Sequence, residues 1–96
     1  MPQGGQPHRA YYVYLVRCAD GTYYAGSTPD LAYRVRLHNA GRGAKYVRGR
    51  GPVALVYTKA YRSCSHALKA EWRLKSRTRQ QKELLVRGYE KKERER

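Results

Sequence analysis

The stretch YYVYLVRCADGTYYAGS, residues 11–27, decides the fold of this chain. Residues 11–18 carry β-branched and aromatic side chains on both alternations, which is typical of a strand that is covered on two faces. Ala19-Asp20-Gly21 is a turn signal, and residues 22–27 are again rich in strand-forming types. The sequence therefore predicts a β-hairpin at this point.

The length of the hairpin loop determines which side chains share a face of the sheet. A two-residue loop at positions 20–21 places Tyr14 and Tyr24 on opposite faces. A three-residue loop at positions 19–21, with Gly21 in the left-handed region, places both tyrosines on one face. The residues themselves allow both registers.

Downstream of the hairpin, the sequence predicts a helix and a third strand. Thr28-Pro29-Asp30 combines a hydroxyl N-cap at Thr28, a proline at the first helical position and an acid in the first turn. Gly41 is expected to end this helix, because glycine readily adopts the left-handed conformation that follows many helices. A flexible basic loop at residues 41–51 then leads to a strand at residues 53–61.

Two further helices complete the predicted elements. Ser63 or Ser65 caps the first of them, and Thr78 with Gln81 forms a capping box at the start of the second. We expect the last helix to end at Val86. The order strand–strand–helix–strand–helix–helix predicts an α+β fold, in which a small three-stranded antiparallel sheet is flanked by helices.

The chain is short and strongly basic. Its 96 residues leave room for one domain. We expect that domain at residues 10–88, between a flexible N-terminal extension at 1–9 and a charged C-terminal tail at 89–96. The 21 lysines and arginines outnumber the seven acids and give a net charge of +14. Such a charge on a small body favours a polyanionic partner, most simply nucleic acid.

Several classes of protein are excluded by the same survey. No apolar run approaches the roughly 18 residues of a membrane span, so no membrane partner is expected. Residues 1–9 lack the apolar segment of a signal peptide. The two cysteines, Cys18 and Cys64, have neither a zinc-binding spacing nor the number needed for a disulfide framework. The expected compartment is therefore the reducing cytoplasm.

Two polar residues interrupt the buried side of the first predicted helix. Arg34 and His38 are one turn apart and lie between Leu31 and Leu37 around the helix axis. They are therefore expected to point toward the sheet or the edge of a cleft. The alternative is structural: Arg34 extends past the core to solvent and His38 makes a local hydrogen bond.

Glu71 is the only acid between positions 31 and 82, where fourteen bases occur. A carboxylate that faces a core is costly unless it is paired or bound to a cation. One alternative is an ion pair with Lys75, one turn further on. The other is a Mg²⁺ site in which one carboxylate holds an ion that keeps several waters. We favour the metal, because Glu71 falls near the centre of an apolar arc formed by Ala67, Leu68, Ala70, Trp72 and Leu74.

A combination of these residues with tyrosine suits phosphodiester cleavage. The chain has ten tyrosines and no phenylalanine, and most of them are expected to be packing residues. In a shared site, a phenol such as Tyr14 or Tyr24 can relay or accept a proton, and Arg34 can stabilise the phosphate. A cation on Glu71 can offset the developing charge. Because a free phenol ionises near pH ~10, its use as a base requires positive charge nearby.

These residues resemble the GIY-YIG nuclease superfamily, particularly its small single-domain bacterial members. Tyr12-Val13-Tyr14 stands in the place of the first tripeptide, and Tyr24-Ala25-Gly26 in that of the second, ten residues on. Tyr12 replaces the first glycine, and Ala25 replaces the isoleucine. The resemblance spans residues 11–85 and implies the three-residue hairpin loop.

The resemblance also implies a function and a set of roles. It indicates a divalent-metal-dependent endonuclease that hydrolyses DNA phosphodiester bonds with Mg²⁺ or Mn²⁺. The implied catalytic residues are a general base at Tyr14, a second active-site tyrosine at Tyr24, a phosphate-contacting arginine at Arg34, an auxiliary proton-transfer residue at His38 and a metal ligand at Glu71.

The glycine-rich loop is the expected nucleic-acid-binding segment. Contacts to the DNA backbone carry no sequence information, so we expect weak sequence specificity or a preference for DNA structure. DNA repair or recombination is the expected setting, RNA is left open as a substrate, and the chain is expected to be a monomer or a weak homodimer. The candidate contact residues are Arg42, Lys45, Tyr46, Arg48 and Arg50.

Two other hypotheses come from different functional classes. The first is a catalytically inactive nucleic-acid-binding module on the same fold, which binds DNA or RNA but cuts neither. The second is a nonspecific basic protein in which Glu71 pairs with Lys75. A cleavage assay with added divalent metal separates these hypotheses from a nuclease.

Overall fold

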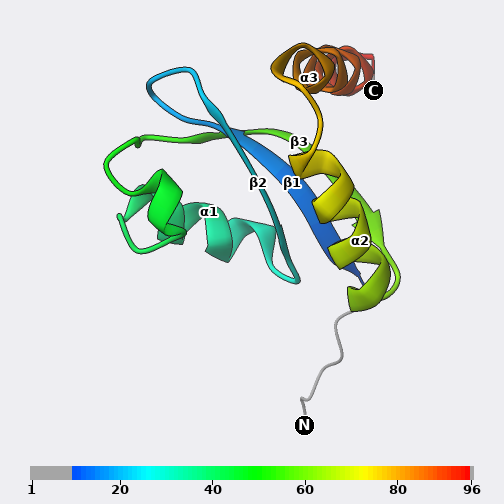
Figure 1. The fold of residues 1–96 in the computed structure, drawn as a ribbon, viewed down its shortest axis with the longest axis horizontal. Coiled ribbons are helices and arrows are strands. Elements are labelled where there is room, and N and C mark those ends of the chain that lie inside the picture. Colours follow the sequence, from blue (N-terminus) through cyan, green and yellow to red (C-terminus); the bar gives the residue numbers. More distant parts are fainter. Residues whose placement is uncertain (1–9, 96) are drawn as a thin grey trace, which may run out of the picture.

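Three antiparallel strands form the centre of the computed structural model, which describes residues 10–95. The strands are β1 (Tyr11–Arg17), β2 (Tyr23–Thr28) and β3 (Ala54–Tyr61), and β1 lies between the other two (Figure 1). The predicted α+β fold and the order of its elements are confirmed. The extension expected at residues 1–9 lies outside the described residues.

The β1–β2 hairpin has the three-residue loop. The amide of Cys18 donates to the carbonyl oxygen of Thr22 at 2.8 Å, and Gly21 adopts a φ of 85°. Only a residue without a Cβ takes this conformation at little cost, which explains the glycine. In the resulting register, Tyr14 and Tyr24 project from the same face of the sheet.

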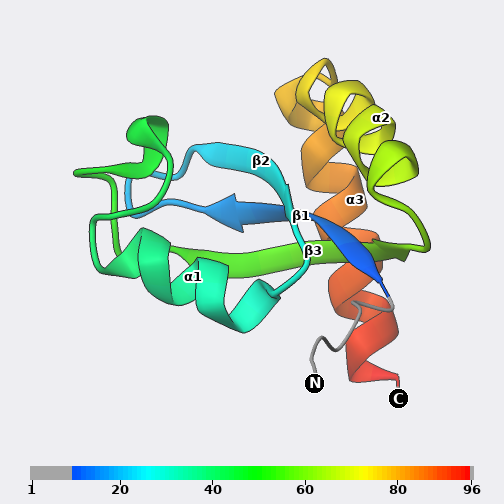
Figure 2. The ribbon, with the colours of Figure 1, turned by 90° about the horizontal axis from the view of Figure 1, so that it is seen from below.

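Helices cover both faces of the sheet. The helix α1 (Leu31–Asn39) lies against one face, whereas α2 (Cys64–Lys75) and α3 (Arg79–Arg94) lie on the other (Figures 1 and 2). A short 3-10 helix, η1 (Lys45–Val47), sits within the basic loop. None of the helices in the described part of the chain is long and apolar enough to cross a membrane.

The alternation of side chains along β1 builds two separate cores. Val13 and Leu15 pack with buried residues of α2 and α3. Tyr14 and Val16 point to the opposite face, where Val47 of the basic loop joins their cluster. Because residues 13–16 are all 2 % exposed or less, the prediction of a strand covered on two faces is confirmed.

The start of α1 differs from the sequence prediction. Its N-cap is Asp30, whose Oδ1 accepts a hydrogen bond from the amide of Tyr33 at 3.1 Å. The N-cap predicted at Thr28 is wrong, because Thr28 is the last residue of β2 and pairs with Tyr12. The Thr28 hydroxyl accepts from the amide of Asp30 at 3.1 Å, which turns the chain from strand into helix. The predicted end of the helix before Gly41 is confirmed, with φ 76° at that glycine.

The last helix is longer than predicted. The capping box of Thr78 and Gln81 is present, but α3 continues past Val86 to Arg94. Glycine in a helix costs only about 1 kcal/mol relative to alanine, so Gly88 does not end it. Beyond the glycine, Tyr89 packs edge-on against Tyr57 of β3, with ring centroids 5.8 Å apart. This packing keeps the last turns of the helix on the sheet.

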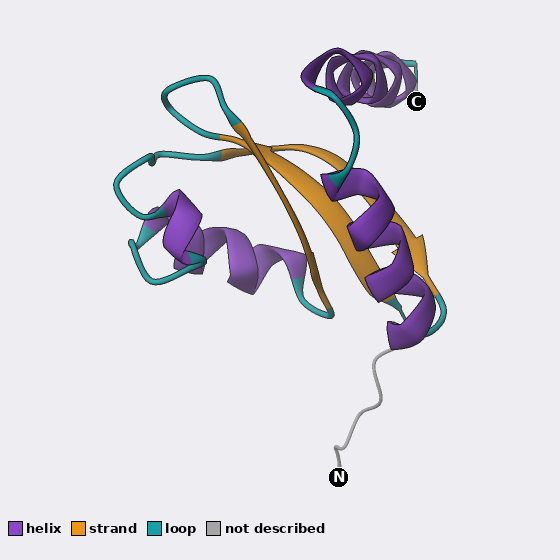
Figure 3. Cartoon of the chain, viewed as in Figure 1, coloured by secondary structure: helices purple, strands orange, loops and turns teal. Residues whose placement is uncertain are grey.

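The basic loop at residues 41–51 is tied to the hairpin turn rather than free. Arg50 forms an ion pair with Asp20 at 2.5 Å, and the carbonyl oxygen of Arg50 accepts from the amide of Ala19 at 2.7 Å. Asn39 bonds both the amide and the carbonyl group of Val53 where β3 approaches. Figure 3 shows the loop beside the hairpin turn, at the end of the sheet where α1 terminates.

Candidate active site

A buried hydrogen bond joins the central strand to α1. The hydroxyl of Tyr14 and Nε2 of His38 are 3.0 Å apart, and both residues are 2 % exposed. The other ring nitrogen, Nδ1 of His38, has no hydrogen-bond partner among residues 10–95. The prediction that His38 points toward the sheet is confirmed, and its partner is a residue of the first tripeptide.

Two glycines provide the space for this pair. A Cβ on Gly26 would lie 2.5 Å from the Tyr14 hydroxyl, and a Cβ on Gly43 would overlap the imidazole of His38. The second tripeptide therefore ends in glycine because the phenol of the first lies directly on it. Gly43 was missed by the sequence reasoning, since a glycine in a glycine-rich loop gives no sign of what it packs against.

Tyr24 stands beside the same imidazole. Its ring meets His38 edge-on, with centroids 5.6 Å apart, and stacks on Tyr46 at 5.9 Å with an interplanar angle of 21°. The guanidinium of Arg50 lies over the ring of Tyr46, 4.4 Å from its centroid. The loop thus contributes a wall to the site, and two of its expected DNA contacts, Tyr46 and Arg50, are engaged within the protein.

The other expected loop contacts remain on the surface. Arg42 and Lys45 are exposed. Arg48 is exposed as well, although its Nε donates to the carbonyl oxygen of Gly43 at 3.3 Å. These three exposed side chains give the loop a positive surface, which suits a phosphate backbone.

Burial dominates the electrostatics of the Tyr14–His38 pair. Desolvation raises the pKa of Tyr14 well above its ordinary value, Tyr24 and Glu71 raise it further, and the charge of Arg34 only partly opposes them. Burial, with a smaller contribution from Arg34, lowers the pKa of His38. At neutral pH the pair is therefore a neutral phenol beside a neutral imidazole. The positive charge expected to make Tyr14 a phenolate is outweighed.

Glu71 reaches the edge strand next to Tyr24. Its Oε1 accepts a hydrogen bond from the Ser27 hydroxyl at 2.6 Å, and its Oε2 forms an ion pair with Lys75 at 2.9 Å. The ammonium of Lys75 in turn lies 5.8 Å from the centroid of the Tyr24 ring. The ion pair considered from the sequence is present, and Lys75 connects it with Tyr24.

The buried face of α2 is narrower than predicted. Ala67, Ala70 and Leu74 are buried, and Glu71 completes their helical stripe at a side-chain exposure of 17 %. Leu68 and Trp72, which were expected in the apolar arc, are 54 % and 72 % exposed. The arc prediction is wrong for these two, because only one side of α2 faces the sheet.

The donor set around Glu71 fits a hard cation held by few protein ligands. A carboxylate and a hydroxyl offer oxygen donors, which Mg²⁺ and Mn²⁺ prefer. No group of three or more His, Cys, Asp or Glu suited to a metal occurs within residues 10–95. Water and substrate phosphate would complete the coordination, as is usual for Mg²⁺. The Lys75 side chain, which is paired with Oε2, is half-exposed.

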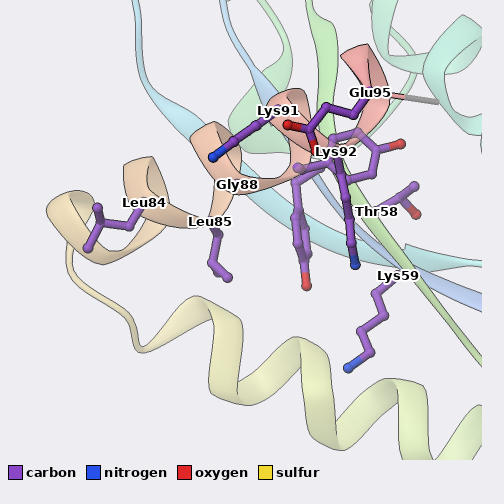
Figure 4. A pocket seen from close by; sticks show the side chains of 10 residues that line it. Thr58, Lys59, Leu84, Leu85, Gly88, Lys91, Lys92 and Glu95 are labelled. Carbon is purple, nitrogen blue, oxygen red and sulfur yellow. The ribbon is translucent and has the colours of Figure 1, made fainter.

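A separate cavity lies away from these residues. It measures about 530 Å³ and opens between β3 and α3, where Figure 4 shows Lys59 and Lys92 beside Leu85. None of the five candidate catalytic residues lines it. The tyrosine site, built around the buried Tyr14–His38 pair, is therefore separate from this cavity.

The family comparison agrees with this geometry. Residues 10–84 match the sequence model of the GIY-YIG catalytic domain. The chain belongs to the GIY-YIG family. It shares the domain of a nuclease-type family, and the matched range contains Tyr14, Tyr24, Arg34, His38 and Glu71.

Relatives of the same size accompany this GIY-YIG domain. The UPF0213 protein VNG_2274C of Halobacterium salinarum is 52 % identical over 75 residues, which cover 78 % of this chain and 97 % of the relative. A UPF0213 protein of Lacticaseibacillus paracasei is 45 % identical over 82 residues, covering 85 % and 92 % of the two chains. The match therefore extends over nearly the whole length of each relative.

Two solution structures resemble this GIY-YIG fold. The UPF0213 protein BH0048 from Bacillus halodurans has 45 % sequence identity and a TM-score of 0.52, covering 80 % of this chain and 82 % of its own. The protein EF2693 from E. faecalis has 37 % identity and a TM-score of 0.57, with coverages of 84 % and 86 %. Both are similar to this chain in sequence and in fold.

Proposed function

We propose that this GIY-YIG protein is a divalent-metal-dependent endonuclease that hydrolyses DNA phosphodiester bonds. The observation that carries the proposal is the Tyr14–His38 hydrogen bond, with Tyr24 against the same imidazole and Glu71 at the adjoining strand edge. A neutral proton acceptor, a phenol and a carboxylate are the groups that activation of water and stabilisation of a phosphate require.

In this proposal, Tyr14 and His38 move a proton as a unit. The raised pKa of Tyr14 keeps its proton in place at neutral pH, so the phenol does not act as a free phenolate. Tyr14 instead takes a proton from the attacking water as it passes its own proton to Nε2 of His38. The lowered pKa of His38 leaves Nε2 available as the acceptor.

The remaining residues bind and orient the phosphate. The charge of Arg34 acts on both members of the pair, and in this proposal its guanidinium contacts the scissile phosphate. Glu71 would hold Mg²⁺ or Mn²⁺, and when bound the ion supplies positive charge at the developing oxyanion. Tyr24, fixed between His38 and Tyr46, borders the position of the scissile bond.

A second candidate is favoured by the state of Glu71. Both carboxylate oxygens are already engaged, one by Ser27 and the other by Lys75. If Lys75 holds this position when DNA binds, the chain is a nucleic-acid-binding module that does not cut. The net charge of +14 supports binding in either case.

A cleavage assay separates the two candidates. The purified chain is incubated with single-stranded, duplex, flap and junction DNA and with RNA, in Mg²⁺, Mn²⁺ or EDTA. We expect DNA cleavage only with a divalent ion, and its loss in Glu71→Gln. The matched control is Glu83→Gln, because Glu83 forms the same type of helical ion pair, with Arg79 at 3.1 Å on α3. Preference for a flap or junction would support a role in repair or recombination.

The opposite outcome is equally clear. Unchanged binding of DNA without product in any metal contradicts the nuclease proposal and supports the binding module. Equal loss of cleavage in Glu71→Gln and Glu83→Gln contradicts the assignment of Glu71 to the site.

A further inference from the structure

Trp72 lies on the surface of α2 and is 72 % exposed. Tryptophan is a large apolar side chain that is highly buried on average in folded proteins, so this degree of exposure is unusual. Within residues 10–95, the structure gives this indole no stacking ring and no cation. Figure 1 shows α2 beside the sheet, next to β1 and β3.

The surroundings of Trp72 are basic. Lys69 and Lys75 are one turn away in either direction along the helix, and Arg73 follows directly in the sequence. All three are exposed. A flat aromatic surface flanked by cations matches a polyanion that carries flat rings of its own, which describes a nucleic acid strand.

Lys75 connects the position of Trp72 with the candidate active site. Trp72 directly follows Glu71, and Lys75 stands one turn from both residues. The ammonium of Lys75 pairs with Glu71 and lies above the ring of Tyr24. A nucleic acid strand with a phosphate near Glu71 and Tyr24 would therefore run past Lys75 toward the indole of Trp72.

We propose that Trp72 stacks on an unpaired base, and that the protein acts on nucleic acid with single-stranded or displaced nucleotides next to the bond that is cut. The part that concerns cutting rests on the proposed nuclease function. Bases inside a duplex present their faces to each other, so an indole on a protein surface gains stacking only where a base is unpaired.

A second copy of the chain is a poorer occupant of this surface. In a two-fold interface, the same patch faces itself, so Lys69, Arg73 and Lys75 would meet their own copies. Each chain also carries a net charge of +14, which opposes close self-association. An anionic strand neutralises the same charges.

The chain contains a single tryptophan, so its fluorescence reports Trp72 alone. The test titrates the full chain, in EDTA, with a single-stranded DNA of about a dozen nucleotides and with a blunt duplex of the same sequence. We expect strong quenching by the single strand, because stacking on a base quenches indole emission, and much weaker quenching by the duplex.

Variants assign the effect to the indole. We expect Trp72→Ala to weaken single-strand binding about tenfold, measured by anisotropy of a labelled oligonucleotide. Trp72→Phe, which keeps an aromatic face, should bind the single strand with an affinity close to that of the parent. The matched control is Leu84→Ala, at an exposed apolar position on α3. This variant should leave the affinity for the single strand unchanged. Because Trp72 is on the surface, these variants are expected to fold, and circular dichroism verifies this.

Three results overturn the inference. These are equal quenching by the blunt duplex, unchanged single-strand binding by Trp72→Ala, and a change of Trp72 emission with protein concentration in the absence of DNA, which indicates self-association. The assay contains no active metal, so it is independent of cleavage. Normal quenching without cleavage in any metal supports base stacking by Trp72, and contradicts the nuclease function together with the part of the inference that concerns cutting.

Discussion

The hydroxyl of Tyr14 and Nε2 of His38 are 3.0 Å apart, although 24 residues separate them in the chain. One comes from the central strand and the other from the last turn of α1. Burial raises the pKa of Tyr14 and lowers the pKa of His38, so both side chains are neutral at pH 7. A neutral phenol that contacts a neutral imidazole can pass it a proton. The following predictions start from this relationship.

Acid should weaken both the fold and the activity through His38. The pKa of His38 is lower in the folded protein than its ordinary value of 6.5. Below that value the unfolded chain binds more protons than the folded one, so stability present above pH 6.5 is lost as the pH falls through the folded pKa. Urea unfolding as a function of pH should show this loss in the parent and a smaller loss in His38→Phe. Identical pH profiles would contradict it.

Base should weaken the fold through Tyr14. Its pKa is raised in the folded protein, so its contribution to stability is complete below the ordinary pKa of 10.0. Above that value the unfolded chain loses the phenolic proton first, and stability falls as the pH rises toward the folded pKa. Comparing urea unfolding of the parent and Tyr14→Phe between neutral and high pH measures this. A difference that does not change with pH would argue against it.

Alanine at the two packing glycines should disturb the pair. Gly26→Ala and Gly43→Ala force a methyl group against Tyr14 and His38, and overpacking of this kind costs about 1–3 kcal/mol. We expect both variants to unfold at a lower urea concentration than the parent and to lose DNA cleavage activity. Gly88→Ala is the control, because nothing lies within 4 Å of its added Cβ. Because Gly88 lies at an exposed position inside α3, Gly88→Ala should raise the free energy of unfolding by about 1 kcal/mol.

The role of Tyr46 should depend on its ring and not on its hydroxyl. Its ring stacks on Tyr24, and the guanidinium of Arg50 lies over it. Tyr46→Phe should therefore retain most of the cleavage rate, whereas Tyr46→Ala should lower it by releasing Tyr24. If Tyr46→Phe is as slow as Tyr46→Ala, the hydroxyl has a direct role.

The arginines of the basic loop should contribute unequally to DNA binding. Arg48→Ala should reduce the slope of log affinity against log salt by about 1, since each phosphate contact on duplex DNA contributes about 0.9. Arg50→Ala should change the slope less, because Arg50 is already paired with Asp20. Equal changes in both variants would show that Arg50 leaves Asp20 to contact the backbone.

The hairpin and the helix signals could be predicted because they depend on neighbouring residues. Gly21 supplied the left-handed turn, and Thr78 with Gln81 supplied the capping box. The cap at Thr28 was missed because pairing with Tyr12, a contact between distant residues, makes Thr28 part of a strand. Local patterns do not carry that information.

The site was only partly predictable for a similar reason. Spacing placed His38 on the buried side of its helix, but its partner depends on the tertiary fold. Periodicity alone left Trp72 in the apolar arc, because it does not show how wide a face the sheet covers. The neutral state of Tyr14 also escaped prediction, since counting nearby bases does not measure burial.

The most direct test of the account is a double-mutant cycle on the Tyr14–His38 pair. Metal-dependent DNA cleavage is compared for Tyr14→Phe, His38→Gln and the double variant. If the two residues transfer the proton as a unit, each single variant cleaves DNA roughly 10²–10⁴-fold more slowly than the parent. The double variant then cleaves no more slowly than the slower of the two single variants. Losses that multiply in the double variant, or a single variant with the parent rate, would contradict the account.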